Sequence, residues 1–127
     1  KFSDAWHVEP LITPRSGVPA SIMPAYPWLM RPLDTAQLGG ELATLARLGV
    51  PYSNEMIDDA QADALAQSRP DSDGAAGVQA RYGEGVALRA FDGNPAELTE
   101  MDAVVAYLQS LGTLTQAPYQ AMKEAAK

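Results

Sequence analysis

The residues best placed to do chemistry lie in one short, proline-stiffened stretch near the start of the chain. A methionine, a tyrosine and a tryptophan are interleaved there with prolines, in the run Met23-Pro24-Ala25-Tyr26-Pro27-Trp28-Leu29. Proline fixes its own φ, lacks an N–H and disfavours the α conformation of the residue before it, so we expect an extended path through 21–29 rather than a helix. Such a loop presents a thioether and two large rings from a stiff backbone. The alternative is that Met23 is a core methionine that fills an irregular gap.

Few other residues can act as nucleophiles or metal ligands. Cysteine is absent, which excludes disulfides, thiolate metal sites, a cysteine nucleophile and the C-x-x-C-H attachment of a c-type haem. His7 is the single histidine, and on a short helix such a residue is more often a partly buried hydrogen-bonding group than a ligand. No serine stands in a nucleophile-elbow setting. The sequence therefore contains no constellation for hydrolysis or group transfer.

Length and charge restrict the classes of function further. The chain has 127 residues, a net charge of −7 and a pI near 4.5, and its length is that of one ordinary domain. Nucleic acid is not expected as a partner, because phosphate binding needs clustered Lys and Arg, whereas an acidic surface suits a basic protein partner. No apolar run approaches the roughly 20 residues that cross a bilayer, so we expect no membrane span in this chain.

The elements that must position the Met23 stretch are helices and loops. Ser3 or Asp4 can accept a hydrogen bond from a first-turn N–H, so we expect a short helix from there to about Leu11. Pro14 is expected to end that helix. Residues 13–20, rich in proline and glycine, are predicted to form a loop that leads into the Met23 stretch.

The next helix carries one apolar stripe of leucines: Leu38, Leu42, Leu45 and Leu48. It begins at Asp34 or Thr35 or, if the unfavourable glycine pair at 39–40 stays outside it, at Glu41. Gly49 is placed to be its left-handed C-cap. The glycine pair also suggests that another backbone comes close to this helix.

A further helix is predicted to open at Ser53, with an apolar side and an acidic side. The apolar side comprises Met56, Ile57, Ala60 and Ala64, with Leu65 as a further candidate. The acidic side comprises Asp58, Asp59 and Asp63, which we interpret as a solvated face. A cation site is the alternative, but these acids lack the glycine-centred spacing of an EF-hand loop.

The part of the chain after that helix is the least organised. Turn signals occur at 70–74 and at 92–95, and residues 86–91 are a candidate short strand between them. The glycines near 83–85 do not form a phosphate loop, because a third glycine, a Lys-Ser/Thr pair and a preceding strand are missing. We interpret residues of about 69–97 as a surface loop insertion.

The strongest helix signal comes last. Thr99 is a predicted N-cap, and Glu100 and Asp102 in the first turn favour the positive end of the helix dipole. An apolar stripe follows in this helix: Met101, Val104, Val105, Leu108 and Leu111. Gly112 is expected to close it. Residues 113–127 are predicted to be a tail, either a weakly amphipathic helix or frayed chain.

Two collinear pieces of the sequence match one family pattern. The first contains Trp6-His7, Pro14-Arg15, Val18-Pro19 and the 23–29 run. The second contains LGVPY at 48–52 and, far downstream, AYLQSLG at 106–112. In that order the pieces resemble the monohaem cytochrome c subunit (subunit II) of cbb3-type cytochrome c oxidases. The MPAYPWL run is the specific part of the resemblance, whereas the final helix is shared by many c-type cytochromes.

The resemblance implies an all-α, partial class I cytochrome c-like fold with long loops, and a non-catalytic electron carrier. Family members hold one haem c, whose iron is ligated by the His of the C-x-x-C-H motif and by the Met of the Met-Pro run. Carried onto this chain, the axial ligand is Met23, a soft and neutral thioether that stabilises reduced iron. Pro24 helps to hold the ligand loop, Tyr26 and Trp28 wall the haem from water, and Arg15 either reaches a haem propionate or stays in solvent.

The sequence departs from the family in one respect. Set against the family pattern, it is expected to start in the middle, without the N-terminal haem-attachment helix, its motif and the membrane anchor. We expect residues 1–127 to be a single truncated cytochrome c-like domain, to which haem c cannot attach covalently for want of cysteine. The alternative hypothesis is a haem-free interaction or assembly domain that docks onto oxidase subunits.

The resemblance also implies a location and partners. The family relays electrons towards the catalytic haem–copper subunit, which reduces oxygen, on the periplasmic side of the bacterial inner membrane. The implied partners are that catalytic subunit and the dihaem cytochrome subunit, with an anchor that is not present in this chain. In a cytochrome c fold the last helix packs on the first, so we expect the stripe of the final helix to lack a partner. The isolated chain is then expected to self-associate, to dock its tail or to fold marginally.

Overall fold

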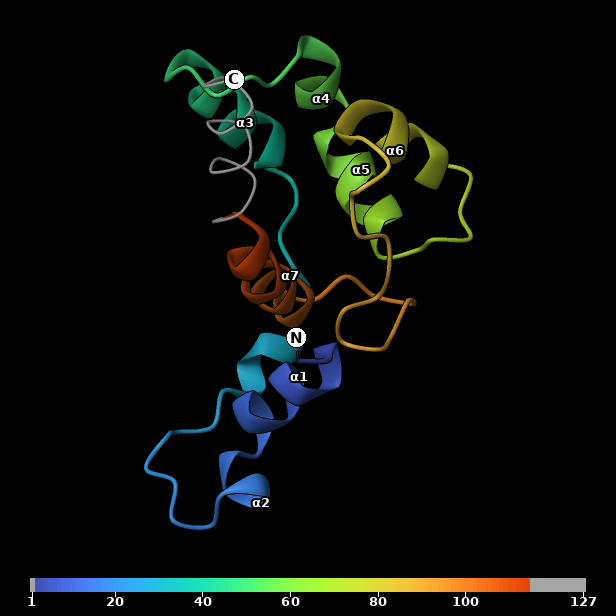
Figure 1. Ribbon diagram of the computed structural model, residues 1–127. Coiled ribbons are helices and arrows are strands. Elements are labelled where there is room, and N and C mark those ends of the chain that lie inside the picture. The colour runs from blue at the N-terminus through green and yellow to red at the C-terminus, as the bar shows by residue number, and fades with distance from the viewer. Residues whose placement is uncertain (1, 115–127) are drawn as a thin grey trace, which may run out of the picture. The chain divides into compact units, whose positions relative to one another are not determined.

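The computed structural model describes residues 2–114 and is all-α, which confirms the predicted fold class (Figure 1). Its elements in chain order are α1 (Asp4–Ile12), α2 (Pro14–Gly17), the 3-10 helix η1 (Pro27–Met30), α3 (Leu38–Arg47), α4 (Asn54–Asp58), α5 (Ala60–Gln67), α6 (Ala75–Tyr82) and α7 (Glu100–Leu114). Residues 2–114 contain no β-strand, so the strand candidate at 86–91 is wrong. No helix in the same range is long and apolar enough to cross a bilayer.

The chain divides into two compact units. Unit 1 comprises residues 2–31, 91–93 and 99–114, and unit 2 comprises residues 32–90 and 94–98. The assignment of 1–127 to a single domain with an insertion at about 69–97 stays a prediction. The predicted tail, apart from its first residues at the end of α7, lies outside the described residues.

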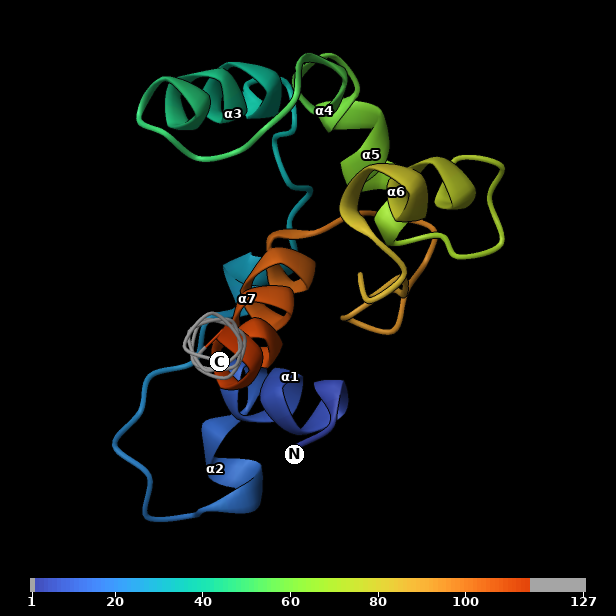
Figure 2. The ribbon, with the colours of Figure 1, turned by 45° about the horizontal axis from the view of Figure 1, so that its top comes forward.

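Unit 1 is built on α1 and α7, which lie side by side in both views (Figure 1, Figure 2). The predicted Ser3 cap is confirmed, because its Oγ accepts a hydrogen bond from the Trp6 N–H at 3.2 Å. Pro14 does not simply end a helix. It opens the one-turn helix α2 in a stretch predicted as loop, since a first helical position needs no N–H donor.

A reciprocal cap starts α7. The Thr99 Oγ1 accepts from the Asp102 N–H at 3.3 Å, and the Asp102 carboxylate accepts from the Thr99 N–H at 2.9 Å, which confirms the predicted N-cap. The Thr99 hydroxyl also lies 2.7 Å from the Asp92 carboxylate, to which it donates. The helix continues through Gly112 to Leu114, contrary to prediction, because a glycine inside a helix costs only about 1 kcal/mol.

The inner face of α7 makes the core of unit 1. Met101 and Val105 are fully buried, and Phe91 is buried with them. On the side that meets α1, the Gln109 side-chain amide donates to the Phe2 carbonyl at 2.8 Å and to the Asp4 carboxylate at 2.9 Å. The expectation that this helix lacks a helical partner is therefore wrong, because α1 supplies one. Self-association stays a prediction.

Within unit 1, a backbone hydrogen bond and an ion pair connect the start of α7 to the end of η1. The Glu100 N–H donates to the Arg31 carbonyl at 3.0 Å, and the Arg31 guanidinium meets the Glu100 carboxylate at 2.7 Å. In unit 2, the Leu33 N–H donates to the Leu98 carbonyl at 2.9 Å. Segments that are far apart in the sequence thus lie next to each other inside each unit.

Unit 2 begins with α3, which starts at Leu38, between the two predicted starts. The chain turns first, since the Asp34 carboxylate accepts from the Ala36 N–H at 3.1 Å. The predicted close approach of a second backbone is confirmed at Gly39, where a Cβ would lie 3.0 Å from the Ile57 carbonyl oxygen. Gly49 ends α3 with φ of 100°, as predicted.

The rest of unit 2 packs through small side chains. The single helix predicted from Ser53 is two, α4 and α5, with Ser53 confirmed as the cap of α4 by a 3.2 Å bond from the Met56 N–H. The predicted insertion contains a helix, α6, which lies beside α5 (Figure 1). A Cβ on Gly74 would come within 2.9 Å of the Ala66 Cβ. The buried apolar side chains of these two helices are correspondingly small: Ala60, Ala66, Ala75 and Val78.

Candidate functional site

The Met23 stretch is the loop that joins α2 to η1 in unit 1. Residues 21–26 contain neither helix nor strand, as the prolines predict. The loop is tied to α1 at its far end, because the Tyr26 N–H donates to the Leu11 carbonyl at 2.7 Å. The prediction fails for the last part of the stretch, where Pro27 opens the 3-10 turn η1. Pro27 lacks an N–H but occupies the first position of that turn, where none is needed.

Met23 lies at the surface of unit 1 and is partly buried. Its N–H donates to the Ser21 Oγ at 3.2 Å. Its neighbour Ile22 is 99% exposed, and Pro24 is exposed as well. Met23 thus differs from Met101, which is completely buried on the inner face of α7. The loop holds a thioether near solvent, outside the apolar core of its unit.

The last residue of the loop, Tyr26, contacts Trp28 in η1. The rings of Tyr26 and Trp28 meet edge to face, with centroids 5.1 Å apart and planes at 77°. Tyr26 is partly buried, whereas Trp28 is 50% exposed. The loop therefore carries a rigid aromatic pair with one open face. That these rings wall a haem stays a prediction.

Arg15 is the basic residue nearest the loop in sequence, and its guanidinium turns towards the loop. The Arg15 Nε donates to the Ser21 carbonyl at 3.4 Å, the long end of the hydrogen-bonding range, and the side chain is otherwise exposed. A guanidinium held this loosely is available to an anionic group. Contact with a haem propionate stays a prediction.

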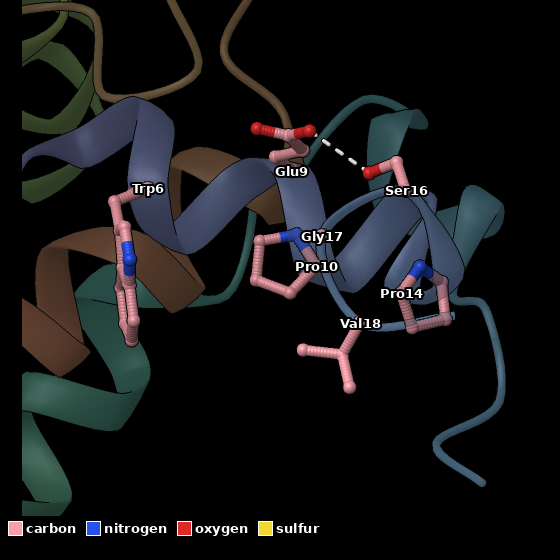
Figure 3. Close-up of a pocket in the computed structure, with 7 residues that line it drawn as sticks. All are labelled: Trp6, Glu9, Pro10, Pro14, Ser16, Gly17 and Val18. Atoms are coloured by element: carbon pink, nitrogen blue, oxygen red, sulfur yellow. Dashed lines mark hydrogen bonds between the residues drawn. The ribbon is translucent and has the colours of Figure 1, made fainter. Parts of the chain in front are cut away.

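A groove of about 230 Å³ opens beside α1 and α2 in the same unit (Figure 3). Its walls are Trp6, Glu9, Pro10, Pro14, Ser16, Gly17 and Val18. The Ser16 hydroxyl donates to the Glu9 carboxylate at 2.8 Å across one side of it. Met23 is not one of the lining residues, so the groove and the thioether are separate features of unit 1.

A second aromatic cluster lies at the start of α1. Phe2 and Trp6 stack with centroids 3.9 Å apart, and both are more than half exposed. His7 meets the Trp6 ring edge to face at 5.2 Å and is partly buried, as predicted. Together with the loop aromatics, this cluster leaves unit 1 with a large exposed aromatic surface.

The chemistry of these side chains fits one half of a haem c site. A thioether is an accepted axial ligand of haem iron, and exposed aromatic and aliphatic side chains offer a surface that a largely apolar macrocycle can cover. The chain has no cysteine, so it cannot supply the thioether bonds that attach haem c. Met23 therefore fits the role of an axial iron ligand, whereas no residue of this chain can attach the haem covalently.

Three acidic residues of unit 2 surround one arginine, an arrangement that sequence reasoning missed. Asp63 was predicted on a solvated face but is 5% exposed, and it accepts from both the Nε and Nη2 of Arg81. Glu55 and Asp59 lie 3.3 Å and 3.5 Å from the Arg81 Nη1. The cation that these carboxylates bind is thus a guanidinium, which joins α4 and α5 to α6. Among the described residues, no group of acidic, histidine or cysteine side chains is arranged to hold a metal ion.

The pair of Asp63 and Arg81 also sets the local electrostatics of unit 2. The hydrogen bonds that Arg81 donates to the Asp63 carboxylate raise the pKa of its guanidinium still further above its usual range. Burial raises the pKa of the neighbouring Tyr82 hydroxyl, and the negative charge of Asp63 adds to that effect. Unit 2 therefore neutralises its buried charge internally and offers no free ligand there.

Comparison with known proteins identifies a family. The family model described as cytochrome C oxidase, mono-heme subunit/FixO matches residues 1–115. No curated protein matches the chain. The matched range includes the whole Met23 loop and all the residues that the structure describes.

Proposed function

Since the chain belongs to the family of mono-haem cytochrome c oxidase subunits, we propose that its Met23 loop supplies an axial ligand to the haem iron. The chain is then an electron-transfer part of a cbb3-type oxidase. It passes electrons towards the catalytic haem–copper subunit, where oxygen is reduced. Its proposed partners are that subunit and the dihaem cytochrome subunit, on the periplasmic side of the bacterial inner membrane.

The observation that carries this proposal is the place of Met23 in the structure. Its side chain is only partly buried on a loop tied to α1, whereas the core of unit 1 is formed without it by Met101, Val105 and Phe91. A methionine needed only for packing belongs among such buried residues. A haem supplies reversible one-electron chemistry when bound, and a neutral thioether favours its reduced form.

The neighbouring residues have supporting roles in this proposal. Pro24 restricts the backbone directly after the ligand. The edge-to-face pair of Tyr26 and Trp28 excludes water from one side of the macrocycle, and burial of the exposed face of Trp28 contributes to binding. Arg15 neutralises a propionate by a charge-assisted hydrogen bond. The attachment of haem c needs cysteines outside this chain.

Replacement of Met23 tests the proposal directly. In the haem-loaded subunit, Met23→Ala should lower the midpoint potential and let imidazole bind the ferric iron, because axial ligands set haem potentials over about 0.8 V. Met30→Ala is the matched control, a partly exposed methionine in η1 of the same unit. An unchanged potential and spectrum in Met23→Ala would remove Met23 from the role of ligand.

One observation favours a second candidate, a haem-free domain that docks onto oxidase subunits. The stacked Phe2–Trp6 pair is exposed, and aromatic side chains of this kind are enriched at protein interfaces. A haem stain and a visible spectrum of the natural gene product distinguish the candidates. A colourless product that still assembles with the oxidase would support the docking domain.

A further inference from the structure

We propose that Ser21 is a positioning residue for Met23, and that its hydroxyl sets how firmly the thioether is held at the iron. This inference rests on the proposed role of Met23 as a ligand. Ser21 does not touch the haem in this proposal. It acts by fixing the backbone from which the ligand side chain departs.

Ser21 is the point where the hydrogen bonds of the loop converge. Its N–H donates to the Val18 carbonyl at 2.9 Å, which closes a tight turn after α2. Its carbonyl accepts from the Arg15 Nε at 3.4 Å, and its Oγ accepts from the Met23 N–H at 3.2 Å. A serine hydroxyl that binds the N–H two residues later holds the intervening backbone in a turn-like conformation.

Side-chain packing does little to hold this part of the loop. Ala20 and Pro24 are exposed, and Ile22 is 99% exposed, so none of them anchors the backbone in a core. The other tie, from the Tyr26 N–H to the Leu11 carbonyl, lies beyond Met23. On the near side of the ligand, the conformation therefore depends on the bonds of Ser21.

The chain contains a matched control for the Ser21 hydroxyl. Ser53 in unit 2 also accepts, through its Oγ, a 3.2 Å hydrogen bond from a methionine N–H, that of Met56. Its neighbours carry none of the residues assigned to the haem. Ser53→Ala thus removes a hydrogen bond of the same chemistry and length without changing the ligand loop.

The test measures imidazole affinity of the ferric, haem-loaded subunit, because imidazole competes with the thioether for the iron. Ser21→Ala should raise this affinity about fivefold, the equivalent of one hydrogen bond of about 1 kcal/mol, and lower the midpoint potential. Ser21→Thr keeps the hydroxyl and should restore both values. Ser53→Ala should leave both unchanged. Circular dichroism checks that each variant keeps its helices.

The possible outcomes separate this inference from the proposed function. If Met23→Ala opens the iron to imidazole but Ser21→Ala does not, the positioning role is overturned while Met23 remains the ligand. If Ser53→Ala changes the affinity as much as Ser21→Ala, the effect is general destabilisation and the inference is again overturned. If Met23→Ala itself changes nothing, the proposed function fails and the inference fails with it.

Discussion

Unit 1 exposes several large aromatic side chains outside its core, whereas unit 2 buries a carboxylate that pairs with a guanidinium of the same unit. Phe2, Trp6 and Trp28 are each at least half exposed, although each is in a ring pair that holds its orientation. Asp63 is buried, and Arg81 satisfies it within the same unit. The buried carboxylate of unit 2 is thus satisfied within the unit, while the exposed aromatic rings of unit 1 can be covered by another molecule.

This difference indicates which unit retains groups that can bind an external molecule. A buried carboxylate with a bidentate guanidinium partner has no remaining capacity for an external ion, so Asp63 is explained by folding alone. Exposed aromatic residues beside a partly exposed thioether have no such explanation in unit 1. Substitutions in each unit test this contrast.

The largest expected effect comes from comparing two methionines of unit 1. Met101→Ala leaves a cavity in the core and should lower the free energy of unfolding by about 2–5 kcal/mol. Met23→Ala removes a side chain from a surface loop and should change it by no more than about 0.5 kcal/mol. Urea denaturation measures both. Similar losses from the two variants would place Met23 in the core and remove the contrast between the units.

The next largest effect is expected from substitution of the buried carboxylate of unit 2. Asp63→Asn keeps the shape of the side chain but loses the charge that binds Arg81, and it should cost about 1–3 kcal/mol. Hydrogen exchange should speed up in peptides of α5 and α6. Asp58→Asn, at an exposed aspartate of α4, is the control and should have little effect. If both variants behave alike, the carboxylate is not held as the structure shows.

A smaller effect is expected from alanine substitutions at two adjacent glycines, which test the close backbone packing of unit 2. Gly40 has nothing within 4 Å of an added Cβ, so Gly40→Ala should stabilise α3 by up to about 1 kcal/mol. Gly39→Ala should lose that gain, because its Cβ would lie 3.0 Å from the Ile57 carbonyl oxygen. Thermal unfolding of the two variants gives the comparison. Equal gains would mean that α3 and α4 are not in contact there.

The smallest effect is a dependence on pH. The Tyr82 pKa is raised above the ordinary value of 10.0, so the folded protein keeps this proton more tightly than the unfolded chain does. The resulting stability is complete below pH 10.0 and is lost as the pH rises from there through the raised pKa. Tyr82→Phe should flatten this loss, which urea titrations on either side of that pH would reveal. Parallel curves for both proteins would show that Tyr82 is solvated.

Local signals in the sequence were enough to predict the ends of several helices. Ser3, Ser53 and Thr99 act as caps, and Gly49 ends α3, because each of these roles depends on a residue and its immediate neighbours. Prolines were harder to interpret. Pro14 and Pro27 each open a short helical turn, which proline at the first helical position allows. The sequence pattern predicts instead that these prolines interrupt helical structure.

The burial of Asp63 could not be predicted from its own helix. Its partner Arg81 lies 18 residues further on, in a segment interpreted as an insertion, so no single-helix pattern contains both. One signal was present. Asp63 shares a face with Ala60 and Ala66, and an acid among small apolar residues points to burial with a cation nearby. The Met23 loop was prominent in the sequence, whereas the hydrogen bonds of Ser21 needed the structure.

The way the chain enters and leaves unit 2 has a practical consequence. Its first and last residues meet, since Leu33 and Leu98 share a backbone hydrogen bond, and in unit 1 Arg31 and Glu100 do the same. A segment whose ends coincide can be excised as a closed piece, and the gap it leaves can be joined by a very short linker. Removal of residues 32–98 would, however, also take residues 91–93 out of unit 1, so a replacement for this segment has to supply an apolar side chain in the place of the buried Phe91.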